Sequence, residues 1–242
     1  KDYIQVQAVS DISPRTPAVE NQILKLREIP APSGTLIGGV AADYADSQGG
    51  IKSKLPIVVT WIVIAVLLLL FMFTGSILLP FKAIVLNFIS LGATIGVMKW
   101  IFVDGHLNWL VGSFTNTGTL DTSMLVLVAV TTFGLSMDYE LFLLSRIKEE
   151  HDAGKGTVDS VAIGLQRSAR IITAAAALLA IIFASFILSG VTSIKILGFG
   201  VAFAILLDAT IIRALLVPAL MRLFGEKNWW APKALKRFTV NH

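Results

Sequence analysis

Four ionisable side chains lie within long apolar stretches of the sequence, where charge is expensive. They are Asp138, Glu140, Asp208 and Arg213. A charged side chain within a membrane span costs roughly 2.5–3.5 kcal/mol on insertion scales, so each one needs a partner or a role. A carboxyl group buried without a cation can gain and lose a proton near neutral pH, which is the chemistry that a proton-coupled transporter needs.

The depth of each residue along its predicted span indicates which of them pair. If the third span enters the membrane near Met124, Glu140 lies roughly 24 Å deep. If the fifth span enters near Ile196, Arg213 lies roughly 25 Å deep. We therefore expect Glu140 and Arg213 to pair across helices. Asp138, at roughly 21 Å, has no cation in these spans that matches its depth.

The helix that carries Asp138 has two polar faces. Helical spacing places Asp138 on one face with Thr131, and Glu140 on nearly the opposite face with Ser136. A helix with polar side chains on both sides belongs inside a bundle rather than against lipid. Tyr139 follows Asp138 and is better placed to donate a hydrogen bond to a carboxylate on another helix. Asp138 and Tyr139 are the candidate proton-relay residues.

The sequence leaves two alternatives open for Asp208: an ion pair with Arg146, or hydrogen bonds accepted from backbone or hydroxyl donors. For Glu140, Asp208 and Arg213 we favour a structural or anchoring role over a direct role in proton transfer.

The sequence shows no sign of an enzyme or of a cofactor site. It has no GxxxxGK[ST] loop for nucleotide binding, and its three histidines, His106, His151 and His242, lack metal-ligand spacing. It has no cysteine, which excludes disulfides and thiolate catalysis. Protons are the only coupling species that we expect.

Composition indicates an integral membrane protein. The chain has 242 residues, of which 55% are hydrophobic and only 15% are charged. The apolar residues form blocks of about 20 residues, the length that a bilayer core of roughly 30 Å requires. The blocks predict an all-α membrane bundle of about five transmembrane helices, at about 55–77, 79–103, 122–147, 169–189 and 194–223.

The placement of basic residues predicts the topology. The loop 146–170 and the tail 226–242 are rich in Lys and Arg, whereas the loop 104–120 has neither. The positive-inside rule then places the first two in the cytoplasm and the third outside the plasma membrane. Residues 1–50 are extracytoplasmic on this topology. Because topology accounts for the basic residues, we expect no nucleic-acid partner.

The polar segments outside these blocks carry two further predictions. Residues 1–50 read as a small β-α-β piece, with strands at 3–9 and 34–42 and a helix that Thr16-Pro17 opens and Pro30 ends. Near 157–168 we predict a short amphipathic helix on the inner leaflet, or an ordinary cytoplasmic helix packed on its neighbours. The main bundle then occupies 51–225.

Small residues predict where helices pack closely. Gly92 and Gly96 form a GxxxG motif in the second span, and Ala174 to Ala184 supply small residues along the fourth. The chain opens at Lys1 in what reads as the middle of a folded unit, so we expect it to be part of a longer protein.

Three motifs in order resemble the MmpL family of the resistance-nodulation-division superfamily. They are GLSMDYELFLLSR at 134–146, DATIIR at 208–213 with LVPA at 216–219, and WWAP at 229–232. The chain is similar to the C-terminal portion of the second repeat of such proteins.

The resemblance implies a twelve-helix pump made of two repeats, each with an extracytoplasmic porter domain of β-α-β units. Residues 1–50 would then be the end of one porter domain. Such pumps couple proton entry to export of lipids, glycolipids, siderophores or drugs. Each repeat carries one Asp-Tyr pair facing the other repeat, and Asp138-Tyr139 matches one of them. Residues on polar positions typical of the family are Glu140, Arg146, Asp208 and Arg213.

The implied partners are the lipid bilayer, a hydrophobic or lipid substrate, and the first repeat of the same protein. Two other interpretations stay open: a non-transporting lipid-sensing or scaffold module, and a translocation partner of the SecF kind. The substrate is undetermined at this point, and a homo-oligomer is compatible with the sequence.

Overall fold

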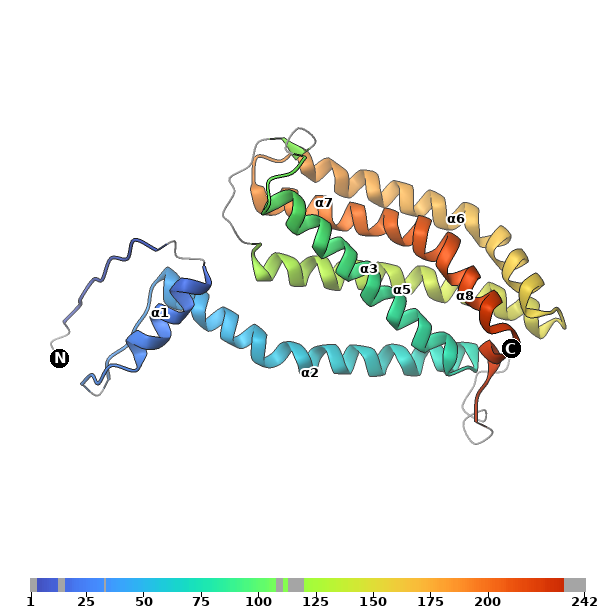
Figure 1. Cartoon of the computed structure of the whole chain (residues 1–242), viewed down its shortest axis with the longest axis horizontal. Coiled ribbons are helices and arrows are strands. Elements are labelled where there is room, and N and C mark those ends of the chain that lie inside the picture. Colours follow the sequence, from blue (N-terminus) through green and yellow to red (C-terminus); the bar gives the residue numbers. More distant parts are fainter. Residues whose placement is uncertain (1–3, 13–15, 33, 108–110, 113–119, 233–242) are drawn as a thin grey trace. The chain divides into compact units, whose positions relative to one another are not determined.

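The computed structural model describes residues 4–12, 16–32, 34–107, 111–112 and 120–232. The chain forms two compact units, residues 1–60 and 61–242. Figure 1 shows the elements along the chain. They are α1 (Pro17–Arg27), α2 (Val40–Thr74), α3 (Leu78–Phe102), α5 (Thr122–Asp152), α6 (Thr157–Ser185), η1 (Phe186–Leu188), α7 (Thr192–Leu207), η2 (Asp208–Leu216), α8 (Val217–Phe224) and η3 (Gly225–Trp229).

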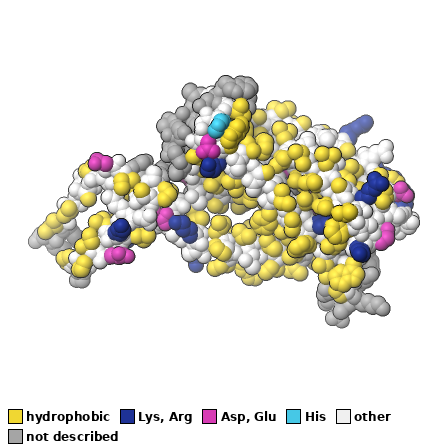
Figure 2. Space-filling view, in the orientation of Figure 1, with side chains coloured by type: hydrophobic (Ala, Val, Ile, Leu, Met, Phe, Trp, Pro, Cys, Tyr) yellow, Lys and Arg dark blue, Asp and Glu magenta, His cyan; other side chains and the backbone are white. Residues whose placement is uncertain are grey.

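Five helical stretches are long and apolar enough to cross a membrane, which confirms the predicted number of spans. They are α2, α3, α5, α6 with η1, and the continuous run from α7 to η3. Hydrophobic side chains cover much of the visible face of the second unit (Figure 2). On α6, Ile171, Leu178 and Ile181 are each more than half exposed. Such a surface is stable only against lipid or another apolar partner.

The first unit is helical, so the predicted β-α-β piece is wrong. Its middle helix is confirmed as α1, but residues 4–9 have no regular secondary structure, and the described part of the chain contains no strand. Ile4 and Val6 are 91% and 85% exposed. An alternating pattern becomes a strand only where a neighbouring strand can accept its backbone hydrogen bonds. Residues 40–42 instead open α2. Tyr3 lies outside the described residues.

A small core and two ion pairs join α1 to the start of α2. Val19 and Ile23 of α1 are buried with Ala42 and Ala45 of α2. Arg27 Nη1 lies 2.5 Å from Asp46 Oδ1, and Lys52 Nζ lies 2.6 Å from Glu20 Oε1. The pKa of Arg27 is raised by its hydrogen bond to Asp46.

The predicted helix at 157–168 is not a separate element. It is the first half of α6, which runs without interruption into the fourth span. No proline lies between residues 157 and 185, and Gly164 is the one glycine there, so nothing in the sequence forces a break. Residues 113–119 of the predicted outer loop and 233–242 of the predicted tail lie outside the described residues.

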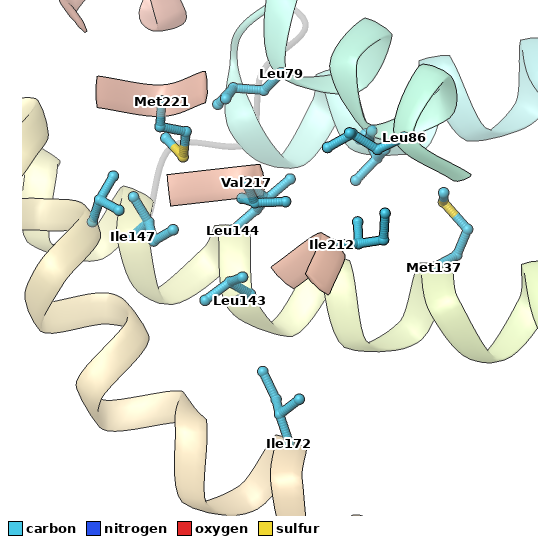
Figure 3. Packing of buried hydrophobic residues seen from close by; sticks show 13 residues of the cluster. Leu79, Leu86, Met137, Leu143, Leu144, Ile147, Ile172, Ile212, Val217 and Met221 are labelled. Atoms are coloured by element: carbon cyan, nitrogen blue, oxygen red, sulfur yellow. The ribbon is translucent and has the colours of Figure 1, made fainter. Parts of the chain in front are cut away.

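The second unit has an apolar core at the end of the bundle where α5 meets α6. Figure 3 shows Leu86, Leu144, Val217 and Met221 converging from α3, α5 and α8. A second core of Met98, Val128, Val201 and other buried side chains lies toward the opposite end. Several buried polar side chains lie between the two cores, and this is where the candidate site lies.

The closest helix contacts occur at glycines other than the predicted GxxxG pair. Gly92 and Gly96 are exposed, and a Cβ atom at either would meet nothing within 4 Å. A Cβ at Gly164 of α6, in contrast, would lie 2.9 Å from the backbone of Ile147 on α5. Ala176 and Ala180 of the predicted alanine face are buried. The motif alone did not identify the helix partner, because glycine is common in membrane helices.

We expect Gly164→Ala to destabilise the bundle, by about 1–3 kcal/mol, because the added methyl group forces two backbones apart. The matched control is Gly92→Ala, which adds the same group where space is open. Thermal unfolding in detergent measures both. Equal unfolding temperatures for the two variants would contradict the prediction.

Candidate functional site

Helix α5 presents one polar stripe to the interior and another to the outside. Its N-terminus is capped by Asp121, whose carboxylate accepts hydrogen bonds from the backbone N–H groups of residues 123 and 124. Thr132, Ser136 and Glu140, spaced four residues apart, are all buried. Asp138 lies on the exposed side of the same helix. The helix therefore has the two polar faces that the sequence predicts, and only one of them is covered by this bundle.

Arg213 is the centre of the buried polar cluster. It is 3% exposed, and its Nε atom donates to Asp208 Oδ2 at 2.7 Å. Its Nη2 atom donates to the carbonyl oxygen of Ser136 and, at 3.2 Å, to the hydroxyl oxygen of the same residue. Its guanidinium carbon lies 5.4 Å from the centre of the Tyr139 ring. Arg213 thus connects the last span to the helix that carries the Asp-Tyr pair.

The π-helix η2 explains why Asp208 and Arg213 meet. In an α-helix, residues five apart point in directions that differ by about 140°. A π-helix bonds residue i to residue i+5 and has a wider turn, which brings such residues much closer to the same face. η2 spans Asp208–Leu216, and the backbone N–H of Val217 donates to the carbonyl of Ile212, in the same five-residue pattern. The local backbone therefore creates the ion pair within one segment.

The predicted pairing of Glu140 with Arg213 is wrong. Glu140 Oε2 accepts a hydrogen bond of 3.1 Å from Asn87 Nδ2 of α3 instead. The alternative that joined Asp208 to Arg146 is also wrong, because Arg146 is exposed and pairs with Glu149 at 2.9 Å. Depth along a span placed Glu140 and Arg213 at similar levels, but it carries no information about which partner the helix rotation brings near.

Asp138 makes no hydrogen bond or ion pair with any residue that the structure describes. Its side chain is exposed on α5, with Gly134 and Ser145 exposed on the same side and Thr131 partly buried. Tyr139 is partly buried and lies under the guanidinium of Arg213. A carboxylate at this depth is too costly to face lipid, so this side of α5 needs a covering element.

Three polar residues of α3 were not predicted as part of the site. Asn87, Ser90 and Thr94 are all buried, at 5%, 2% and 0% exposure. Their spacing of three and four residues on an otherwise apolar span was the signal that the sequence offered. Because they are neutral, they cost less within a membrane span than a charged side chain does, so the cost of charge did not single them out.

A second group of contacts ties the C-terminal segment to the α5–α6 connection. Glu226 Oε1 accepts from the backbone N–H and the hydroxyl of Thr157, at 3.2 and 2.7 Å. Trp229 Nε1 donates to the same hydroxyl at 2.9 Å, and its ring stacks on His151 with centroids 4.0 Å apart. These contacts cap the start of α6 and hold the helix that carries Arg213 against α5 and α6.

Comparison with known proteins gives this arrangement its family. The model of the MMPL family matches residues 8–240. The chain belongs to the MMPL family. It is therefore a multi-pass membrane protein of a transporter family within the resistance-nodulation-division superfamily, and the SecF alternative is set aside.

Relatives of this MMPL chain include named lipid exporters. It is 41% identical to the trehalose monomycolate exporter MmpL3 of Mycobacterium tuberculosis over 89% of this chain and 23% of the relative. It is 35% identical to the mycolic acid-containing lipids exporter MmpL11 of Mycolicibacterium smegmatis over 98% of this chain and 25% of the relative. The chain thus spans about a quarter of the length of these relatives.

Proposed function

We propose that this MMPL chain is part of an exporter of lipids, glycolipids or other hydrophobic compounds, driven by the proton-motive force across the plasma membrane. Asp138 and Tyr139 form half of its proton relay. The observation that carries the proposal is the position of Asp138: an exposed carboxylate, without a described partner, on an apolar helix whose opposite face is buried and polar.

The exposed position of Asp138 fits a partner in another part of the same protein. Protonation removes the charge, and a neutral carboxyl group is far less costly in a low-dielectric setting. A change in its charge therefore changes which helix packing is favoured, which is how proton binding drives a conformational step. The covering element that we propose is the first repeat, with its own Asp-Tyr pair.

The buried polar cluster fixes the orientation of α5, the helix that carries the proposed relay residues. Arg213 holds the backbone of Ser136 and the ring of Tyr139, so the rotation of α5 about its axis is set by the last span. Asp208 neutralises Arg213, and Glu140 with Asn87 ties α5 to α3. In our proposal the loop 146–170 and the C-terminal tail are cytoplasmic and the first unit is extracytoplasmic.

The test is gradient-driven export by the full-length protein in proteoliposomes. Trehalose monomycolate, the lipid in the name of the 41% identical relatives, is the probe. We expect movement of the probe across the bilayer under an imposed pH gradient, and its loss when a protonophore collapses that gradient. Binding of the probe without gradient-dependent movement would overturn the proposal in favour of a lipid-sensing or scaffold module.

A further inference from the structure

Two stripes of buried polar side chains lie on α3 and α5, and they meet where Asn87 of α3 bonds Glu140 of α5. Neither stripe belongs to the exposed Asp138 side of α5, and together they line the space between the two apolar cores. The members are Asn87, Ser90 and Thr94 on α3, and Thr132, Ser136 and Glu140 on α5. We call this set the α3–α5 seam.

The register of the two helices brings these stripes together. α3 and α5 run in opposite directions (Figure 1), and the hydrogen bond from Asn87 to Glu140 fixes their relative position. Because the helices are antiparallel, Ser90 lies one turn from Asn87 in the same direction in which Ser136 lies one turn from Glu140. Thr94 and Thr132 follow one turn further in that direction. Each stripe therefore extends over about two turns of helix.

The seam contains polar atoms that the protein itself does not satisfy. Ser90 Oγ, Thr132 Oγ1 and Arg213 Nη1 are buried and have no hydrogen-bond partner in the described part of the chain. All three residues are at most 5% exposed. Buried polar atoms of this kind are ordinarily bound by water, and a site with several polar groups is where a buried water is stable.

The lower end of the seam opens on a cavity of about 10 Å³, close to the volume that one water molecule needs. Glu140 and Lys82 line it together with apolar side chains of α3, α5 and α8. The groups that act on Glu140 are Arg213 and Asp208 from η2 and Asn87 from α3, and Lys82 of α3 faces the same cavity. Lys82 itself donates to the side chain of Asn228.

We infer that the α3–α5 seam binds a file of water molecules and conducts protons from the level of Thr94 and Thr132, past Arg213, to Glu140 and on to the cavity beside Lys82. Each water or hydroxyl oxygen accepts one proton and releases another, so no atom is gained or lost. The carboxylate of Glu140 takes the proton and then passes it to water in the cavity. This inference rests on the proposed proton coupling, and it adds a route within this bundle, separate from Asp138.

A purely structural role for the hydroxyl groups is the competing explanation, and it applies to only part of the seam. Thr94 Oγ1 donates to the carbonyl of Ser90 at 2.9 Å, a common bond within a membrane helix. Ser90 and Thr132 make no such bond. These two residues are therefore the positions at which bound water and simple packing predict different results.

The experiment compares Thr132→Val and Ser90→Ala with Thr173→Val and Ser185→Ala in the full-length protein. The two control hydroxyl groups are exposed on α6 and bond their own helix. The first readout is radiolytic hydroxyl labelling of Met137, which follows Ser136 on α5 and is 7% exposed. Because bulk water does not reach this residue, we expect efficient labelling only from water bound in the seam. We expect at least a severalfold loss of labelling in the seam variants and none in the controls.

The second readout is proton uptake into proteoliposomes under a pH gradient. We expect a loss on the order of a hundredfold for Glu140→Gln, the size of effect typical of a positioned proton-transfer group. We expect a smaller loss for Thr132→Val. Normal labelling of Met137 and normal proton uptake in the seam variants would overturn the inference, and so would labelling that is as low in the parent protein as in Thr132→Val.

The two proposals fail in different ways. If Asp138→Asn abolishes gradient-driven export while the seam variants behave as the parent does, the seam inference is wrong and the proposed function stands. If Asp138→Asn exports normally, the proposed function is wrong, and the proton route that rests on it falls as well. In that case the labelling of Met137 tests only whether the seam binds water.

Discussion

Gradient-driven export should fall on the order of a hundredfold in the variant Asp138→Asn of the full-length protein. Asparagine has nearly the same volume as aspartate and keeps the ability to accept a hydrogen bond, but it cannot take up a proton. If the charge of Asp138 is what shifts helix packing, its removal uncouples the gradient from the transport step while leaving the fold intact. The measurement is export of the test lipid in proteoliposomes under a fixed pH gradient.

The matched control is Asp159→Asn. Asp159 is an exposed carboxylate in the first turn of α6, where the same change removes the same charge outside the apolar part of the helix. We expect export by this variant to be within about twofold of the parent, as for most surface substitutions. Undiminished export by Asp138→Asn, under a gradient shown to be intact, contradicts the assignment of Asp138 to the proton relay.

The second large effect is expected at Arg213. Arg213→Met leaves the carboxylate of Asp208 buried at 4% exposure without its cation, and it removes both hydrogen bonds to Ser136. Breaking one side of a buried ion pair costs about 3–5 kcal/mol. We therefore expect a fall in thermal stability and a loss of export, because the rotation of α5 and the ring of Tyr139 are no longer held.

Two further variants separate the charge from the geometry. Arg213→Lys keeps the positive charge but cannot contact Asp208 and Ser136 together through a planar fork. We expect it to recover part of the stability and little of the export. In Lys99→Met an exposed pair with Asp104, at 3.1 Å, is lost, and the expected cost is at most about 1 kcal/mol. Equal unfolding temperatures for Arg213→Met and Lys99→Met would show that the buried pair is not structural.

Local rules predicted the face of α5 on which Asp138 lies, but they did not predict the partner of Glu140. Helical spacing alone separated the face of Asp138 from that of Glu140, because residues two apart on a helix point in directions that differ by about 200°. The partner of Glu140 is Asn87, which lies 53 positions earlier in the chain. Contacts over such separations depend on helix rotation and register, which depth estimates do not contain.

In the N-terminal unit, the error was a strand predicted from a local pattern alone. Alternation at residues 4–9 is a valid strand pattern, yet a strand also needs a neighbour for its backbone groups. The helix opened by Thr16-Pro17 was predicted correctly as α1, because proline at the first turn and hydrogen bonds within the helix are local. The number of spans was also predicted correctly, because block length and apolar composition are local properties of the sequence.

By itself, the sequence determined the class of protein, the number of membrane spans and the residues whose charge needs an explanation. These follow from composition, block length and the cost of charge in lipid, which do not depend on the tertiary arrangement. Only the tertiary structure decided that Arg213 pairs with Asp208 through a π-helix, that Glu140 bonds Asn87, and that a buried polar seam joins α3 to α5. Asp138, in contrast, lies outside that seam, on the exposed face of α5.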